Sequence, residues 1–182
     1  MDTLRLNPPI ILTLSRILLV PIFILTVYYH PIFGALIFSI ASITDFLDGY
    51  LARHFGEITK LGIILDPIAD KFLVVSALIV LVDMERLPAW IAIIIIVREF
   101  LVTGLRAIAL SKNIIIPAET GGKIKTTTQM IAILCLIIMG SVFDIDLYGF
   151  DLYDIGLILI WIALALSVIS GLQYAFSFWK RI

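Results

Sequence analysis

The chain has 182 residues, of which 62% are apolar and only 15% are charged, and its formal net charge is −1. A soluble domain is about 45–50% apolar, so this composition excludes an ordinary water-soluble fold. The small net charge provides no general attraction to nucleic acid. A single cysteine, Cys135, excludes an internal disulfide and a cysteine zinc site.

Six apolar runs, separated by proline, glycine or charged residues, predict six helices. A membrane-spanning helix needs about 20 apolar residues, so the chain has room for six spans and short loops but not for a second, soluble domain. The predicted spans are 9–29, 31–55, 58–83, 88–110, 121–143 and 153–179, after a short juxtamembrane segment at 1–7. We therefore expect an all-α integral membrane protein with one membrane domain over residues 1–182.

The distribution of basic residues predicts the orientation, because lysine and arginine gather in cytoplasmic loops. With the N-terminus inside, Arg86 is the one basic residue in the outer loops. The other basic residues at loops and span ends then lie inside: Arg5, Arg53, Lys60, Arg106, Lys112, Lys123, Lys125, Lys180 and Arg181. We therefore expect a multi-pass protein of the cell (inner) membrane with both termini in the cytoplasm.

Four aspartates lie inside the second and third predicted spans: Asp45, Asp48, Asp66 and Asp70. An acid at the bilayer centre costs about 2.5–3.5 kcal/mol on insertion scales, so such residues are functional candidates. The first two are spaced i,i+3 and the last two i,i+4, so each pair shares a helix face. A hairpin over about 31–83 would bring the two faces together at matched depth.

Four facing carboxylates repel one another unless they are protonated or bind metal. Hard divalent cations such as Mg²⁺ and Mn²⁺ prefer oxygen ligands, and four acids suit two adjacent ions that clamp a phosphoryl group. The small residues Gly49, Ala52 and Gly62 allow a ligand to approach the backbone closely. Arg53, at the predicted cytoplasmic mouth, is suited to hold a phosphate.

The same aspartates are also compatible with a cation pathway in a transport protein. Such a pathway should carry polar groups on toward the outer face, and we find no continuation through the last three predicted spans. The glycine, alanine and arginine companions of the aspartates have no role in a pathway. The pattern therefore favours an enzyme that acts on phosphoryl groups, with transport as the alternative.

The segment 44–70 reads TDFLDGYLARHFGEITKLGIILDPIAD. It fills every fixed position of D-x-x-D-G-x-x-A-R-x8-G-x3-D-x3-D, and in this it resembles the CDP-alcohol phosphatidyltransferases. The resemblance implies a homodimer that transfers a phosphatidyl group from CDP-diacylglycerol to an alcohol and releases CMP. By the same resemblance, Asp45, Asp48 and Asp66 would be metal ligands, and Asp70 would be the general base and also a ligand.

The residues between the aspartates acquire roles by the same resemblance. It implies that the CDP-lipid site is lined by Gly49, Ala52, Arg53, Thr59 and Gly62. The site would open sideways to membrane lipid and downward to the cytoplasm, from which the water-soluble acceptor enters.

The flanking segments resemble one branch of this family, the phosphatidylglycerolphosphate synthases, whose acceptor is sn-glycerol 3-phosphate. NPPIILTLSR matches the outline N-x-P-x-x-L-T-x-x-R, which adds Asn7, Thr13 and Arg16 to the CDP-lipid site. VREFLVTGLRAIA and GGKIKTTTQM are also similar to that branch. Other acceptors with the same chemistry (inositol phosphate, serine, phosphatidylglycerol) remain alternatives.

Four basic residues are predicted to bind the acceptor phosphate: Arg98, Arg106, Lys123 and Lys125. A dianionic phosphate needs such donors. Any cytoplasmic membrane edge also attracts basic residues, so a general role at the membrane surface is the competing interpretation for each of them.

Overall fold

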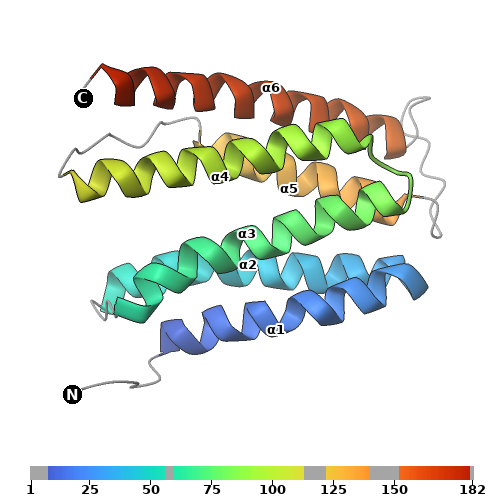
Figure 1. Ribbon diagram of the computed structural model, residues 1–182. Helices are drawn as coiled ribbons and strands as arrows, with labels where there is room; N and C mark the ends of the chain where they lie inside the picture. Colours follow the sequence, from blue (N-terminus) through green and yellow to red (C-terminus); the bar gives the residue numbers. More distant parts are fainter. Residues whose placement is uncertain (1–7, 56–59, 113–121, 140–151, 181–182) are drawn as a thin grey trace.

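The computed structural model describes residues 8–55, 60–112, 122–139 and 152–180, and the side chains of 15–44, 71–109, 111–112, 124–139 and 152–180. The described elements are helices, and the two connections that the structure describes, α1–α2 and α3–α4, are short (Figure 1). They are α1 (Pro8–Tyr29), α2 (Pro31–Phe55), α3 (Lys60–Asp83), α4 (Ala89–Ser111), α5 (Gly122–Ile138) and α6 (Leu152–Trp179). For these residues, the all-α prediction is confirmed.

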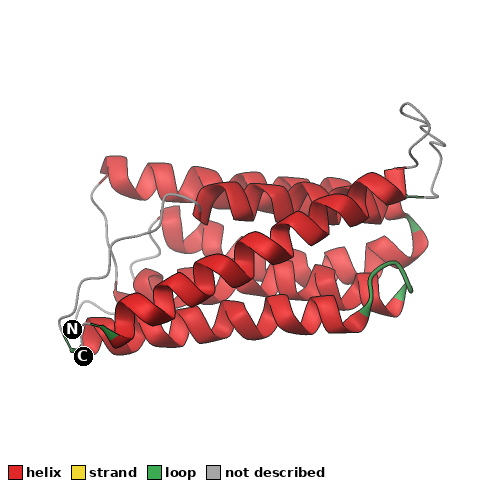
Figure 2. Cartoon of the chain, turned by 90° about the horizontal axis from the view of Figure 1, so that it is seen from above, coloured by secondary structure: helices red, strands yellow, loops and turns green. Residues whose placement is uncertain are grey.

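The helices run up and down in a bundle, and Figures 1 and 2 show them side by side along its length. At one end α1 begins, α2 ends, α3 begins and α6 ends; we call this the Lys60 end. The opposite end holds the α1–α2 and α3–α4 turns, and we call it the Arg86 end. Helix α1 packs on α2 and α3, while α6 packs on α4 and most extensively on α5. Helices α2 and α3 both contact α5, which joins the two groups.

A close helix crossing at the Arg86 end depends on Gly34. Helix α2 opens at Pro31, a position where proline is tolerated because the first helical N–H has no intrahelical partner. One turn later, a Cβ on Gly34 would lie 2.7 Å from the Cα of Val27. Only a hydrogen at this position lets the backbones of α1 and α2 approach so closely.

The α3–α4 turn caps two helices. Glu85 has a φ of 57°, in the left-handed region, and the N–H groups of Arg86 and Leu87 donate to the Leu81 carbonyl at 2.9 and 3.1 Å. Arg86 Nη1 then donates to the carbonyl of Ile137 at 2.6 Å. Burial of the Arg86 guanidinium lowers its pKa from the ordinary value.

The Arg86 guanidinium caps the end of α5. Arg86 Nη1 also donates to the carbonyl of Leu136 at 3.1 Å, so one guanidinium serves two of the last carbonyls of the helix. The expected span 121–143 was too long at its end, because α5 stops at Ile138.

The described apolar core lies toward the Arg86 end. Its largest fully buried apolar side chains are Phe23, Val27, Phe38, Leu78, Leu81, Ile91, Ile95, Ile133, Leu136, Ile137 and Ile160. The rings of Phe23 and Phe38 meet at 5.8 Å between centroids. The buried polar side chains Arg16, Lys125 and Ser170 come from stretches of α1, α5 and α6 nearer the Lys60 end.

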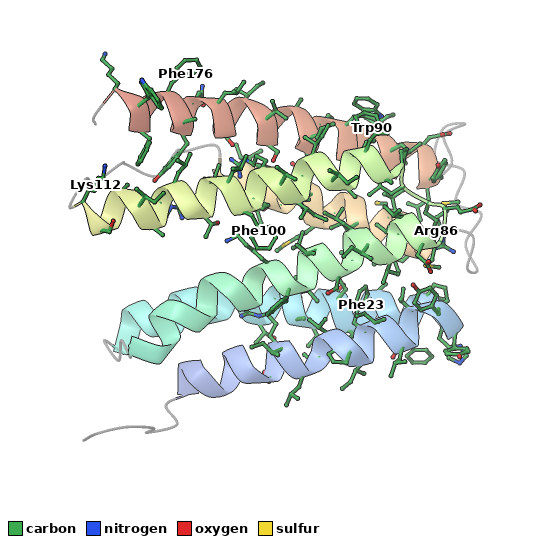
Figure 3. All side chains as sticks on the ribbon, in the orientation of Figure 1. Phe23, Arg86, Trp90, Phe100, Lys112 and Phe176 are labelled. Carbon is green, nitrogen blue, oxygen red and sulfur yellow. The ribbon has the colours of Figure 1, made fainter. Side chains whose placement is uncertain are left out.

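Large apolar side chains also cover the outside of the bundle. Trp90 and Phe176 are 47% and 74% exposed, and Phe176 points away from the bundle in Figure 3. The Trp90 ring meets Trp161 of α6 edge-on at 5.3 Å. Among the described residues, α6 is the one helix that is long and apolar enough to cross a membrane by length and composition.

Candidate active site

The four aspartates lie on two consecutive helices, Asp45 and Asp48 on α2 and Asp66 and Asp70 on α3. Helix α2 ends and α3 begins at the same end of the bundle (Figure 1). Asp45 lies ten residues before the end of α2 and Asp70 ten residues after the start of α3, each roughly 15 Å along its helix. Their side chains lie outside the described set, so the contacts among them stay a prediction.

The other residues expected around CDP-lipid lie mostly in the same stretch. Gly49, Ala52 and Arg53 belong to α2, Gly62 to α3 and Thr13 to α1, again without described side chains, while Asn7 and Thr59 lie outside the described residues. The side chains that are described contain no group of three or more histidine, cysteine or acidic residues suited to a metal.

Arg16 is the one member of the expected CDP-lipid site with a described side chain, and it is only 2% exposed. A buried guanidinium is costly without a partner, and Arg16 does have one. It lies on α1, the helix that packs against both α2 and α3. Its burial there agrees with a role beside the aspartate helices and does not fit an arginine that merely faces the membrane surface.

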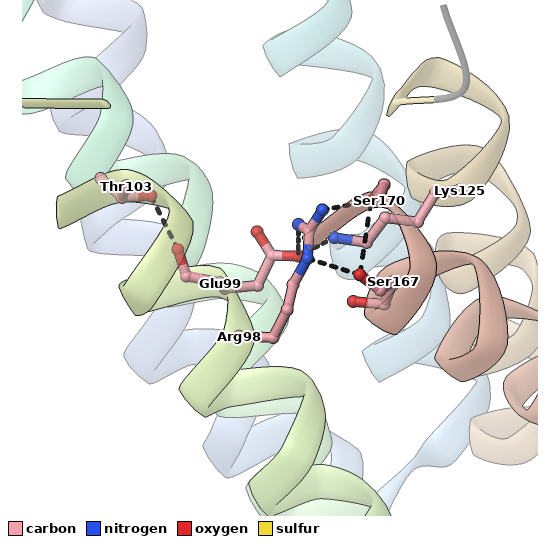
Figure 4. A network of polar contacts seen from close by, with 6 residues as sticks. All are labelled: Arg98, Glu99, Thr103, Lys125, Ser167 and Ser170. Atoms are coloured by element: carbon pink, nitrogen blue, oxygen red, sulfur yellow. Dashed lines mark hydrogen bonds and ion pairs between the residues drawn. The ribbon is translucent and has the colours of Figure 1, made fainter. Parts of the chain in front are cut away.

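Two of the four predicted phosphate-binding residues meet inside the bundle. Arg98 of α4 and Lys125 of α5 both donate to Glu99 Oε1, from Arg98 Nη1 at 3.2 Å and from Lys125 Nζ in a close contact (Figure 4). The Lys125 side chain is 5% exposed and that of Arg98 is 16% exposed. Two side chains thus share one carboxylate oxygen, and with all three groups ionised the trio carries one net positive charge.

Helix α6 supplies further contacts to this trio. Arg98 Nε donates to the carbonyl of Ser167 at 2.7 Å, and Arg98 Nη2 donates to Ser170 Oγ. A Cβ on Gly171 would lie 3.1 Å from both Cγ and Nε of Arg98. Sequence reasoning missed these residues, because none of the motifs that carried the resemblance lies on α6. The available signal was a serine–serine–glycine group spaced i, i+3, i+4 in an apolar helix.

Lys71 of α3 adds a further cation to the electrostatic surroundings of Lys125. It follows Asp70 directly on α3, and it lies close enough to Lys125 to repel it electrostatically, as Arg98 does. Helix α3 also packs against α4 and α5. Cations from α3, α4 and α5 therefore influence one another electrostatically, and the one from α3 is the residue that follows Asp70.

Arg106 and Lys123 do not share the described contacts of this trio. The Arg106 guanidinium carbon lies 5.9 Å from the centroid of the Tyr174 ring, in cation–π geometry, on an exposed part of α4. Lys123 belongs to α5, but its side chain lies outside the described set. The structure thus brings together Arg98 and Lys125 and places Arg106 against α6.

Comparison with known proteins identifies the family of the chain. Residues 6–169 match the family model described as CDP-alcohol phosphatidyltransferase. The CDP-diacylglycerol–glycerol-3-phosphate 3-phosphatidyltransferase of Bacillus subtilis is 38% identical, over 97% of each chain. The enzyme of that name from Rickettsia bellii is 42% identical over 92% of this chain and 93% of its own. A probable phosphatidylglycerophosphate synthase of Mycobacterium tuberculosis is 40% identical over 90% of this chain and 78% of its own.

The helical bundle and these matches define a transferase of phospholipid biosynthesis. The chain belongs to the CDP-alcohol phosphatidyltransferase family, and the family matched in the sequence is confirmed. The enzyme interpretation therefore prevails over cation transport.

Proposed function

We propose that the protein transfers the phosphatidyl group of CDP-diacylglycerol to sn-glycerol 3-phosphate, giving phosphatidylglycerol phosphate and CMP. The observation that carries the choice of acceptor is the buried Arg98–Glu99–Lys125 trio and its net positive charge. An acceptor with a phosphate of its own needs a second cationic site beside the one that holds the CDP diphosphate. Serine and other acceptors without a phosphate give no such reason to bury two cations. The printed names of the Bacillus and Rickettsia relatives support the same acceptor.

Metal is expected at the aspartate hairpin. The donor set consists of four carboxylates on α2 and α3, at positions that are paired along the two helices, and oxygen-only donors suit Mg²⁺ or Mn²⁺. Asp45, Asp48, Asp66 and Asp70 would hold two ions. Such ions, when bound, would offset the negative charge of the diphosphate.

The protein's own residues then have separate roles. Arg53, with Gly49, Ala52, Thr59 and Gly62, would hold the CDP end of the lipid substrate. Asn7, Thr13 and Arg16 would approach it from the α1 side. Arg98 and Lys125 would bind the acceptor phosphate, with Lys123 and Arg106 nearer its path of entry.

Asp70 would act as the general base. It would accept the proton of the glycerol hydroxyl as that oxygen attacks the phosphorus atom that carries the diacylglycerol. The new P–O bond forms as the P–O bond to CMP breaks, and CMP leaves with the electron pair. Positioning and charge stabilisation supply most of the catalysis in such transfers, so the site needs no covalent nucleophile.

We further propose that all six helices span the membrane, with the Lys60 end in the cytoplasm, and that two copies form a homodimer. The support for spanning is the apolar outer surface of the bundle, because soluble monomers rarely expose large apolar patches. The cytoplasmic orientation rests on the basic residues near the Lys60 end. The active site would then face the cytoplasm at the inner membrane.

The decisive test measures CMP release by the purified protein in detergent. The protein receives CDP-diacylglycerol, Mg²⁺ or Mn²⁺, and one acceptor at a time: glycerol 3-phosphate, inositol phosphate, serine or phosphatidylglycerol. We expect release with glycerol 3-phosphate, loss of release with EDTA, and recovery when either metal is added back.

The outcomes separate the parts of the proposal. Release with serine alone would preserve the transfer chemistry and overturn the role given to Arg98 and Lys125. Release with inositol phosphate or phosphatidylglycerol alone would overturn the choice of glycerol 3-phosphate. Undiminished release in EDTA would overturn the metal site at the aspartates.

A further inference from the structure

We propose that Ser170 of α6 is a positioning residue for the acceptor: together with Gly171 and the Ser167 carbonyl, it orients the Arg98 guanidinium toward the acceptor phosphate. This inference rests on the proposed function, because it takes Arg98 as a phosphate-binding residue. We call Ser167, Ser170 and Gly171 the α6 seat.

The hydrogen bonds of Arg98 divide its three guanidinium nitrogens between two directions. Nε and Nη2 donate to α6, at the Ser167 carbonyl and Ser170 Oγ. Nη1 donates to Glu99 Oε1, the oxygen that Lys125 also contacts (Figure 4). Because a guanidinium is planar and rigid, two fixed nitrogens determine where the third one points. The α6 seat therefore directs Nη1 toward the position of Glu99 Oε1, where an anion contacts both Arg98 and Lys125.

The packing of the α6 seat is equally specific. Arg98 passes so close to Gly171 that a Cβ there would lie 3.1 Å from its Cγ and Nε. Ser170 is 8% exposed, and its hydroxyl also donates to the Ser167 carbonyl at 3.3 Å. Ser170 and Gly171 follow the last residue of the family match, at 169. The α6 seat therefore combines Ser167, which lies inside the family match, with two residues just beyond its end.

Arg106 illustrates what an arginine of α4 does without such a seat. It lies two turns beyond Arg98, is exposed, and has its guanidinium carbon over the Tyr174 ring at 5.9 Å. A ring face attracts a cation without fixing the direction of each nitrogen. The difference between these two arginines is the pair of directed hydrogen bonds from Arg98 to α6.

The test compares steady-state kinetics of Ser170→Ala with those of the wild-type protein. We expect the KM for glycerol 3-phosphate to rise about tenfold, the size expected for one hydrogen bond to a charged group. The KM for CDP-diacylglycerol and kcat at saturating acceptor should change less than twofold. Ser170→Thr retains the hydroxyl and should restore most of the acceptor affinity.

Two further variants control for general effects of substitution in α6. Ser177→Ala removes a hydroxyl two turns further along α6, outside the α6 seat, and should leave both KM values unchanged. In an Arg98→Lys background, Ser170→Ala should add little to the rise in acceptor KM, because Ser170 acts through the guanidinium.

The outcomes distinguish failure of the Ser170 role from failure of the proposed function. Equal acceptor KM values for Ser170→Ala and Ser177→Ala, in a protein that uses glycerol 3-phosphate, overturn the role of Ser170 and leave the proposed function intact. A similar rise in both substrate KM values, with lost thermal stability, also overturns it, because it indicates a structural role. If the wild-type protein transfers nothing to glycerol 3-phosphate, the proposed function fails and this inference fails with it.

Discussion

Glu99 allows Arg98 and Lys125 to be buried together in a largely apolar bundle. Its Oε1 accepts from both side chains, and Thr103 Oγ1 donates to its backbone carbonyl at 2.8 Å. Like charges brought together in a poorly hydrated site repel, so a shared anion lowers the free energy of the folded state. In the proposed function, the acceptor phosphate would bring negative charge to the same two cations.

Replacing Glu99 by glutamine therefore has two expected effects. The variant should lose on the order of 2 kcal/mol of folding stability, less than a fully buried pair would lose because the Glu99 side chain keeps 23% of its surface exposed. Glycerol 3-phosphate should stabilise the variant more than the wild-type protein, since it supplies the missing negative charge. Thermal unfolding in detergent, with and without the ligand, measures both effects.

Glu85→Gln is the matched control, because Glu85 is an exposed acid in the α3–α4 turn at the Arg86 end. Glu85→Gln should change neither the midpoint of thermal unfolding nor the stabilisation by glycerol 3-phosphate. An equal ligand response in Glu99→Gln and wild-type protein would contradict the idea that the phosphate meets the cations paired with Glu99.

Asp70 is the residue on which the proposed chemistry depends most. Asp70→Asn keeps the side-chain size but removes the base, so we expect CMP release to be abolished while Mn²⁺ binding is partly retained. CMP release and Mn²⁺ titration by electron paramagnetic resonance measure the two properties. Asp154→Asn, at the exposed start of α6, is the control and should retain turnover. Full turnover by Asp70→Asn would rule out its role as the base.

At the scale of the element, the helices were largely predictable because proline, glycine and charge punctuate the apolar runs. The second predicted span, 31–55, coincides with α2, which opens at Pro31. The end of α5 was not predictable, because the cap comes from Arg86, about fifty residues earlier in the chain. Apolar composition alone shows no reason for a helix to stop at Ile138.

The candidate site was predictable in a similarly uneven way. The fixed spacing within one hairpin singled out Asp45, Asp48, Asp66 and Asp70. Consecutive helices of a hairpin lie next to each other, so residues close in the sequence can be expected to meet. Arg98 and Lys125 could be proposed as separate cations, but sequence periodicity does not say which helices face each other. Predicting the α6 seat requires knowing which helices face each other, because Ser170 and Gly171 by themselves are equally typical of ordinary helix packing.

The α1–α2 crossing provides a test of packing at this scale. Gly34→Ala should lower the thermal midpoint by several degrees, because the new Cβ would lie 2.7 Å from the Cα of Val27 and the helices must separate. Gly104→Ala is the matched control, since a Cβ there meets nothing within 4 Å. Alanine in the open helical position should raise stability slightly, by about 0.5–1 kcal/mol. Equal midpoints for the two variants would contradict the close crossing.

For the whole molecule, the proposed orientation predicts which end of the bundle is accessible from outside the cell. In a Cys135→Ser background, Ala89→Cys lies at the Arg86 end and Lys112→Cys beyond the last residue of α4, both at exposed positions. A membrane-impermeant maleimide added to intact bacteria should label the cysteine at 89 and should label the one at 112 only after permeabilisation. The reverse pattern would invert the orientation, and labelling of both in intact cells would exclude it.

The described part of the apolar core lies toward the Arg86 end, which has a consequence for the cell's energy supply. A membrane that stores a proton gradient cannot tolerate a continuous polar path through a protein that spans it. In the proposed orientation, the tightly packed side chains around Phe23, Phe38 and Leu78 lie between the buried charges and the outside, and each is 0% exposed. Closely packed apolar side chains exclude water. This layer would act as electrical insulation, so that charged substrates are handled inside the bilayer without proton leakage.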